Sequence, residues 1–430
     1  MSRPSDDELR SKLEEACPGS LRRLDSGMGI GGTRIAVCAE PDDADRLATL
    51  LATLDRLRVP AAIAGAETKQ WLGNPLRGAR VVVSTRRLAG IDELDAADGV
   101  VRVGAGTLLA DVAAKAEAAG WLLPFDPPGT RGTVGGLLAT ALTGPRRLAF
   151  GPVRDNVLGL DTVLADGSRT RCGARVVKNV TGYDLAKLYV GSLGTLGVIE
   201  RAWLRLRALP QSTRVFRASA PSGGALALAL ACARRPTARA VALISDSLVA
   251  AAPALGVATR ASASLGLMVE FAGDTPATDR DASWLAAQTA SEEVSPRVID
   301  GLRELQTFVA GIGVRARIHA LPSRLEACCA TLVSGGARMM VQPVPGIVTV
   351  WFDADRGDDE DPWWLDRVLG VLDAARATAR GDLIIEAQPA WASGRRDVFG
   401  GAPGLSLMRT LKGRFDPNGI LNPGRFVGAI

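Results

Sequence analysis

The sequence predicts an α+β fold in two main parts, and three observations support this prediction. Glycines and turn residues crowd into Phe125–Ile199, between short apolar segments typical of strands. After Pro210 the pattern changes to strand and helix signals without glycine-rich loops, and it runs twice through the order β-α-β-β-α. Residues 389–404 again read as loop, and a tail at 405–430 follows. We therefore expect domains at 1–210 and 211–390, followed by a C-terminal segment at 391–430.

Length and charge bound the class of protein. The chain has 430 residues, of which 47% are hydrophobic, which is enough for sizeable cores. Its 51 basic and 46 acidic residues leave a net charge of +5 without a long run of one sign. Charge alone therefore implies neither nucleic acid nor an anionic membrane as a partner.

The sequence also bears on location and metals. The acidic N-terminus lacks an apolar signal core, and the small apolar run at 225–233 is far shorter than the roughly 18 residues of a membrane helix. We expect a cytoplasmic chain with no membrane span. The cysteines form no C-x-x-C pair and show no zinc or iron–sulfur spacing, so we expect free thiols and no metal. They are Cys17, Cys38, Cys172, Cys232, Cys328 and Cys329.

The first part alternates helices and short strands. The leucine spacing after Asp42 predicts an amphipathic helix to Leu57, and the strand that follows runs into a loop at 65–69. Asp166-Gly167 predicts a two-residue hairpin. The other expected elements are strands at 34–38, 61–64, 81–84, 100–103, 176–180 and 200–206, a helix from 108 that ends at Gly120, and a helix at 184–190.

Two G-x-G patterns raise the alternative of a dinucleotide-binding βαβ unit. The pattern at Gly27–Gly32 precedes a strand, whereas that fingerprint follows a strand and opens a helix. The pattern at Gly104-Ala105-Gly106 has Leu109 in place of the third glycine and no acidic residue about 20 positions later. Ordinary turns explain both patterns better.

The second part predicts two ferredoxin-like units lying against each other. They share a pattern of elements and no visible sequence identity. The first has strands at 214–218, 240–244 and 266–271 and helices at 225–234 and 280–289; the second has strands at 314–319, 338–343, 347–352 and 383–386 and helices at 322–333 and 362–379.

The glycine-rich loops point to a phosphate-bearing ligand. Gly129, Gly132, Gly135 and Gly136 lack side chains that would keep backbone N–H groups away from a ligand. For a single loop of this kind, tight turns in a β-rich domain are the better explanation. Three loops together, with the loop at 65–69 directly after a strand, favour phosphate binding.

These loops, in this order, resemble the PCMH-type FAD-binding domain of the vanillyl-alcohol-oxidase superfamily. The resemblance covers roughly 36–210 and the D-P-N-G-I-L-N-P-G-R-F tail at 416–426, which is similar to the family's C-terminal return to the FAD domain. Its most specific element is 177–188 followed by Gly-Ser-Leu-Gly-Thr-Leu-Gly at 191–197. Within the superfamily, the chain is most similar to the FAD-binding E subunits of bacterial glycolate oxidases.

The resemblance implies a site. The first pyrophosphate loop is expected at 65–69 and the second at 129–144, while 194–199 is expected along the adenine end of FAD. The implied FAD-binding residues are Gly65, Thr68, Lys69, Gly129, Thr133, Gly135, Gly136, Gly144, Lys178, Gly182, Asp184, Gly194, Thr195, Gly197, Val198 and Ile199.

Two features depart from the family. Ala66-Glu67 replace glycines of the first loop, and the Glu67 carboxylate should repel a pyrophosphate unless it points outward or pairs with Lys69. Relatives that hold flavin covalently use a histidine or cysteine in these loops. The only histidine here is His319, so we expect FAD to be held without a covalent bond.

The substrate side of the reaction is less defined. Oxidising a 2-hydroxy acid needs a base and a cationic group for the carboxylate. His319 reads as a solvated or core residue. For Arg315, Arg317 and Arg324, carboxylate binding and a solvated face remain equal alternatives, and Trp363-Trp364 suits either packing or a partner surface.

Three functions are open from the sequence. The first, implied by the resemblance, is an FAD-binding subunit that oxidises glycolate with a catalytic flavin subunit and an iron–sulfur subunit, with peripheral attachment to the inner face of the membrane left open. The second is a self-sufficient flavin oxidoreductase acting on another alcohol or 2-hydroxy acid. The third is a non-catalytic scaffold with the same fold. No catalytic residue is assigned.

Overall fold

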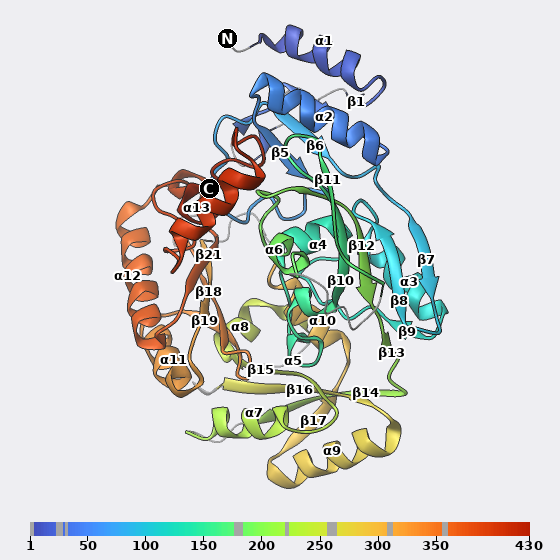
Figure 1. Ribbon diagram of the computed structural model, residues 1–430. Coiled ribbons are helices and arrows are strands. Elements are labelled where there is room, and N and C mark those ends of the chain that lie inside the picture. Colours follow the sequence, from blue (N-terminus) through green and yellow to red (C-terminus); the bar gives the residue numbers. More distant parts are fainter. Residues whose placement is uncertain are drawn as a thin grey trace.

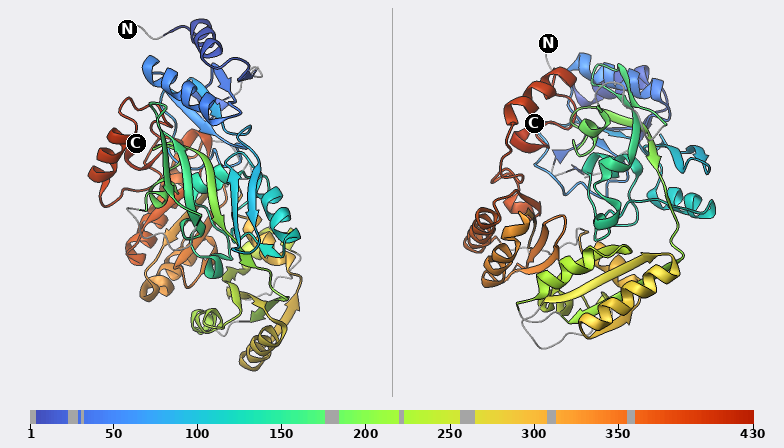
Figure 2. Two further views of the ribbon diagram at one scale, coloured as in Figure 1. Left: turned by 45° about the vertical axis from the view of Figure 1, so that its right-hand side comes forward. Right: turned by 60° about the horizontal axis from the view of Figure 1, so that its bottom comes forward.

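A computed structural model describes residues 4–22, 29–30, 33–175, 184–219, 223–255, 265–307, 313–354 and 360–430. The fold is α+β, as predicted. Figure 1 shows the blue-to-green first part beside a large yellow-to-orange sheet, with the red helix α13 lying back over the first part. Figure 2 shows the same two bodies from the side and from below.

The first part begins with a small sheet in the order β1-β4-β6-β5, in which β6 pairs in parallel with both β4 and β5. Helix α2 packs its leucines onto this sheet, as the spacing predicted, and Asp43 caps its first turn through the N–H of Arg46. The elements are α1 (Asp6–Ala16), β1 (Leu21–Arg22), β4 (Val37–Ala39), α2 (Ala44–Leu57), β5 (Ala61–Ala64) and β6 (Val81–Ser84), with a hairpin of β2 (Gly29–Ile30) and β3 (Thr33–Arg34).

A second, antiparallel sheet follows in the order β11-β10-β12-β8-β7. The predicted hairpin at Asp166-Gly167 joins β10 and β11, and Gly167 has the positive φ of 83° that this turn requires. The elements are β7 (Ile91–Asp95), β8 (Val100–Gly104), α3 (Leu109–Ala118), β9 (Trp121–Leu122), α4 (Val134–Thr140), α5 (Arg147–Phe150), η1 (Val153–Asn156), β10 (Val157–Val163), β11 (Arg169–Gly173), α6 (Ala186–Tyr189), β12 (Val198–Arg205) and β13 (Arg207–Ala208). The strand expected at 176–180 lies outside the described residues.

The second part is one eight-stranded antiparallel sheet in the order β17-β14-β16-β15-β19-β20-β18-β21. Each half has the ferredoxin-like order 4-1-3-2 of its own strands, as predicted. The halves do not lie against each other, however. They join edge to edge where Leu243 and Ile244 of β15 pair with Val341 and Met340 of β19.

Helices cover both faces of this sheet. One face packs a continuous core under α7, α9, α11 and α12, and the first half of the other face is covered by α8 and α10. The sequence missed α8, α10 and β17. The elements are β14 (Ser212–Ser219), α7 (Ala225–Ala233), β15 (Ala238–Ser245), α8 (Asp246–Ala251), η2 (Pro253–Leu255), β16 (Leu265–Gly273), α9 (Thr275–Gln288), β17 (Ser291–Val294), α10 (Arg297–Glu304), β18 (Val314–His319), η3 (Pro322–Arg324), α11 (Leu325–Ser334), β19 (Arg338–Gln342), β20 (Ile347–Phe352), α12 (Pro362–Ala379) and β21 (Leu383–Ala387).

The tail returns to the first part. After η4 (Ala390–Ala392) and α13 (Leu405–Phe415), Leu421 forms a parallel bridge with Ala61 of β5, and η5 (Val427–Ala429) ends the described chain. We propose domain limits at 1–210, 211–390 and 391–430 on this arrangement. Within the described ranges, no helix is both long and apolar enough to cross a membrane.

Candidate functional site

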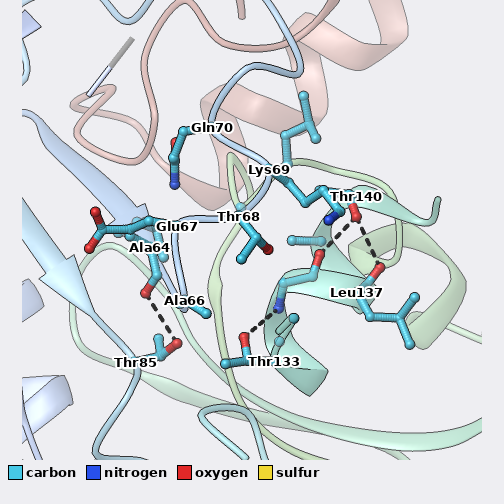
Figure 3. A pocket seen from close by; sticks show the side chains of 18 of the residues that line it. Ala64, Ala66, Glu67, Thr68, Lys69, Gln70, Thr85, Thr133, Leu137 and Thr140 are labelled. Carbon is cyan, nitrogen blue, oxygen red and sulfur yellow. Dashed lines mark hydrogen bonds between the residues drawn. The ribbon is translucent and has the colours of Figure 1, made fainter. Parts of the chain in front are cut away.

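A pocket opens where the loops after β5, before α4 and before β12 meet the returning tail. It encloses about 930 Å³, counting the open solvent at its mouth. Figure 3 shows that its side chains come from the segment after β5 and from α4 and the loop before it. The lining is Ile63–Gln70, Leu72, Thr85, Leu109, Pro127–Gly129, Gly132, Thr133, Gly135–Leu137, Ala139, Thr140, Leu193, Gly194, Gly197–Ile199, Asn422 and Arg425.

The first loop presents free backbone donors to this pocket. In the described chain, the N–H groups of residues 65–69 donate no hydrogen bond. A Cβ built on Gly65 would lie 2.4 Å from Thr133 Oγ1, so only glycine lets the loop lie this close to the start of α4. Successive unpaired amides form a concave site for an anion. This loop can therefore hold a phosphate.

The second loop ends by opening α4. Thr133 caps the helix through the N–H of Gly136 at 3.2 Å, and Thr140 Oγ1 donates to the Gly136 carbonyl at 2.8 Å (Figure 3). The N–H of Gly135 donates to the Ala105 carbonyl at 2.8 Å, which ties the loop to the end of β8. Since a Cβ on Gly136 would meet only Thr133 Oγ1, the other space beside Gly136 remains open to the pocket.

The tail fixes these loops together. Asn422 Oδ1 accepts the N–H of Ile63 at 2.8 Å, and its Nδ2 donates to the Leu193 carbonyl at 2.7 Å. Lys412 donates to the carbonyls of Thr195 and Leu421 at 2.7 and 2.9 Å. The loop before β12, the strand before the first loop and the tail thus form one hydrogen-bonded unit around the pocket.

Two cations reach this pocket. Arg425 is 6% exposed and donates to the carbonyls of Asn74 and Gln70, and no described carboxylate forms an ion pair with it. Burial lowers the pKa of Arg425 to about 10. Burial also lowers the pKa of Lys69, despite the nearby Glu304. A buried cation without a counter-charge is costly, so the pocket is suited to a bound anion.

Glu67 lines the same pocket as Lys69, but the two side chains leave the loop in different directions. In Figure 3 the Glu67 carboxylate and the Lys69 amine point to opposite sides of the loop. The pKa of Arg22 on β1 is raised first by Cys38 and to a smaller degree by Glu40 and Glu67. Glu67 also adopts a φ of 61°, a conformation that glycine reaches more easily.

Most of the predicted cofactor residues lie together in this pocket, but not all of them. Thr195 is buried and its hydroxyl donates to Ser192, Gly144 lies against Asp126 and Arg303, and Asp184 forms an exposed ion pair with Lys187. Lys178 and Gly182 lie outside the described residues. The predicted residues that line the pocket are Gly65, Thr68, Lys69, Gly129, Thr133, Gly135, Gly136, Gly194, Gly197, Val198 and Ile199.

Two of the three candidate arginines of the second part (211–390), here called the cap, do not lie on a solvated face. Arg315 is 0% exposed and Arg317 is largely buried, because both pair with Glu386 of β21; Arg324 is exposed. His319 is partly buried, and burial followed by nearby arginines lowers its pKa to about 4. It is therefore neutral at neutral pH. Trp364 packs in the core while Trp363 is 75% exposed, so they do not form an exposed pair.

Arg425 was missed as a site residue. The sequence shows an arginine at this place in the tail. Only the structure shows that this arginine is buried and that no described carboxylate forms an ion pair with it. Asn422 lies in the same motif, and its two-sided hydrogen bonding depends on Ile63, which is 359 positions away.

Comparisons with known proteins agree with this geometry. Residues 35–173 match the model of the FAD binding domain, and residues 399–426 match that of the C-terminal domain of FAD linked oxidases. These two segments supply most of the pocket and the tail that closes it. The cofactor is FAD. Both matched segments are of the FAD-linked oxidoreductase type.

Curated relatives match less than half of the chain. The chain is 39% identical over 162 residues to glycolate oxidase subunit GlcE of Escherichia coli, covering 37% of this chain and 46% of that protein. It is 34% identical over 203 residues to a D-lactate dehydrogenase of Archaeoglobus fulgidus, covering 46% of each. The chain thus spans about half the length of these relatives.

Solved structures show the same fold over nearly the whole chain. A 4-ethylphenol oxidase from Gulosibacter chungangensis aligns with a TM-score of 0.70 at 14% identity, covering 97% of both chains. An alkyldihydroxyacetonephosphate synthase aligns with a TM-score of 0.69 at 15% identity, covering 98% of this chain and 85% of that one. At this identity the likeness concerns the fold alone.

Proposed function

We propose that this chain is the FAD-binding subunit of a complex that oxidises glycolate to glyoxylate with partner subunits. The observation that carries the proposal is the pocket, in which the unpaired amides of residues 65–69 and the unpaired cation Arg425 meet at one anion site. The 39% identity to a glycolate oxidase subunit supports the choice of substrate.

The residues of the pocket suit FAD. The amides of 65–69 would hold the diphosphate, and Arg425 and Lys69 would balance its charge. Gly194, Gly197, Val198 and Ile199 line the same pocket as the first loop, and they would lie along the adenine end of FAD. Bound FAD supplies hydride and electron transfer, while the protein orients it and controls what reaches it.

We propose that FAD is held without a covalent bond. Among the described residues that line the pocket there is neither histidine nor cysteine. Denaturing the purified chain in acid should therefore release all of its yellow chromophore. Colour that stays with the precipitated protein would contradict this.

The partner subunits belong to the same proposal. Among the described residues, no cluster of three or more His, Cys, Asp or Glu side chains is placed to hold a metal ion. We propose that an iron–sulfur subunit carries electrons onward and that a second flavin subunit shares in substrate oxidation. The test compares glycolate oxidation by the FAD-loaded chain alone with oxidation by the complex purified from its host. Equal rates would overturn the partner requirement.

A self-sufficient oxidoreductase is the second candidate. The buried arginine pair on β18 favours it, because a chain that never meets an anionic substrate has no evident need for that pair. Bleaching of the flavin band by glycolate, D-lactate or another 2-hydroxy acid in the purified chain would support it. The main support for the scaffold alternative is weaker than the sequence suggested, since the Glu67 carboxylate and the Lys69 amine point to opposite sides of the first loop.

A further inference from the structure

One face of β18 carries a row of basic side chains inside the protein. Alternate residues of a strand face opposite sides of the sheet. Arg315, Arg317 and His319 lie on the side away from α11 and α12. The antiparallel register places them beside Trp351, Thr349 and Ile347 of β20, while the core set is Val314, Ala316 and Ile318.

The charges on this face do not balance. Among the described residues, Glu386 is the carboxylate that pairs with both arginines, at 3.2 Å to Arg315 Nε and 3.3 Å to Arg317 Nε. Arg147 of α5 approaches from the first domain and lowers the pKa of His319, after burial and Arg317. Asp382 and Glu386 oppose this effect only in part. Arg315 and Arg317 therefore share one close carboxylate, that of Glu386, and Arg147 adds a further positive charge nearby.

Several buried polar atoms here have no partner among the described residues. They include Arg315 Nη2, His319 Nε2 and the Oε1 of Gln342, a residue on β19, which is separated from β18 by β20. Arg315 is 0% exposed and Gln342 is 2% exposed, so bulk solvent does not satisfy them. Buried polar atoms in native proteins are nearly always paired, and a set of orphans on one face indicates a missing ligand.

This face continues from the FAD pocket. The Arg315 guanidinium lies 4.4 Å from the centre of the Trp71 ring, two residues after the first loop, and donates to the Thr307 carbonyl at 2.7 Å. A Cβ on Gly129 would lie 3.4 Å from Thr307 and 3.1 Å from Lys69 Nζ. The arginine pair therefore begins where the pocket lining meets the cap.

We propose that Arg315 and Arg317 bind the carboxylate of a small 2-hydroxy acid at the cap end of the FAD pocket. The guanidinium groups supply charge-assisted hydrogen bonds to the carboxylate, and Glu386 holds them in place. The inference rests on the proposed function, and it assigns acid binding to this chain rather than to a partner subunit.

Acetate serves as a non-oxidisable probe of this site. It is titrated into the full chain, with and without FAD, at an ionic strength held constant with chloride, and thermal midpoint and flavin absorption are recorded. The variants are Arg317→Met, which keeps the apolar stem, and Arg315→Lys, which keeps the buried charge. Arg324→Met, on exposed η3, is the matched control. FAD affinity is measured separately for each.

Acetate should act saturably on the wild type and on Arg324→Met, and about tenfold more weakly on Arg317→Met, whose FAD affinity should stay within about twofold of wild type. Arg315→Lys should also weaken acetate binding. An FAD-loaded chain with no saturable response to acetate, or an Arg317→Met variant with an unchanged response, overturns the inference. If a variant lost FAD binding and acetate binding equally, Arg315 and Arg317 would be assigned to binding the flavin itself, which would also overturn the inference. A chain that binds acetate but not FAD would sink the proposed function alone.

Discussion

Asn422 of the C-terminal tail accepts a hydrogen bond from the N–H of Ile63 at 2.8 Å. Its side-chain amide also donates to Leu193, and its own N–H donates to Ala61 at 2.9 Å. A single residue near the end of the chain therefore sets the spacing between the first loop and the loop before β12. The FAD pocket depends on this tail for its shape.

Replacing Asn422 with Ala should destabilise the protein and weaken FAD binding. The N–H of Ile63 and the carbonyl of Leu193 would lose their buried partner, which costs roughly 2–3 kcal/mol. Urea unfolding measures this loss. Asn418→Ala is the control, because exposed Asn418 donates a single described hydrogen bond, to Asp55, and its replacement should change stability by less than about 0.5 kcal/mol. Equal effects of the two variants would contradict this role for Asn422.

Arg425→Met should separate stability from cofactor binding. Removing a buried cation that lacks a carboxylate should leave the thermal midpoint of the FAD-free chain unchanged or raise it. FAD affinity should fall about tenfold, since one charge-assisted bond to an anion is lost. Calorimetric titration with FAD measures the affinity, and exposed Arg409→Met serves as control. An unchanged FAD affinity in Arg425→Met would show that this cation serves another purpose.

Gly136→Leu should abolish stabilisation by FAD. At about 100 times its dissociation constant, FAD should stabilise the wild type by about 2.7 kcal/mol. A leucine at 136 would extend past Thr133 into the pocket and exclude the diphosphate. Gly370→Leu, on an exposed turn of α12 with open space around it, should leave the FAD response intact. A normal thermal shift with FAD in Gly136→Leu would place the cofactor elsewhere.

His319 should make the protein less stable in acid. Its folded pKa of about 4 lies below the ordinary value of 6.5, because burial and Arg317 and Arg147 disfavour the charged form. The unfolded chain therefore binds the extra proton between pH 6.5 and 4, and stability falls as pH decreases through that window. In His319→Asn, the free energy of unfolding should decrease less on acidification, by on the order of 1–3 kcal/mol at pH 4. Parallel unfolding curves of the two proteins from pH 7 to 4 would refute it.

Arg146 should act as a clamp between the two domains. It pairs with buried Glu270 of β16 at 2.9 Å and with Asp300 of α10 at 2.7 Å. Hydrogen bonds from Arg239 and Arg146 outweigh burial and lower the pKa of Glu270. Arg146→Met should cost about 3 kcal/mol in urea unfolding. Arg214, which forms ion pairs with Asp279 and Glu293 near the surface, is the comparison. Arg214→Met should lower the free energy of unfolding by less than about 1 kcal/mol. Similar losses in both variants would argue against the clamp.

The sequence allowed the loops to be predicted but not the helix they open. Gly135 and Gly136 are poor helix formers, so the pattern at 129–136 reads as turns. In the structure the cap at Thr133 and the bond from Gly135 to Ala105 start α4 regardless. Tertiary contacts overrode local propensity there.

The cap was predicted as two units but not as one sheet, because the β15–β19 pairing joins residues about a hundred positions apart with no pattern that marks it. The arginines of β18 looked solvated for a similar reason. Their partner Glu386 lies 71 residues from Arg315, and no spacing rule links the two. Burial of a charge follows from such distant partners, which composition and periodicity do not reveal.

Reconstitution of the complex tests the central claim most directly. Wild-type chain, Gly136→Leu and Gly370→Leu are each combined with the partner subunits from the native host, and glycolate oxidation is measured together with bound FAD. We predict that wild type and Gly370→Leu restore oxidation with FAD bound to this chain, while Gly136→Leu assembles but restores little. Full glycolate oxidation by a complex whose Gly136→Leu subunit carries no FAD would contradict the account.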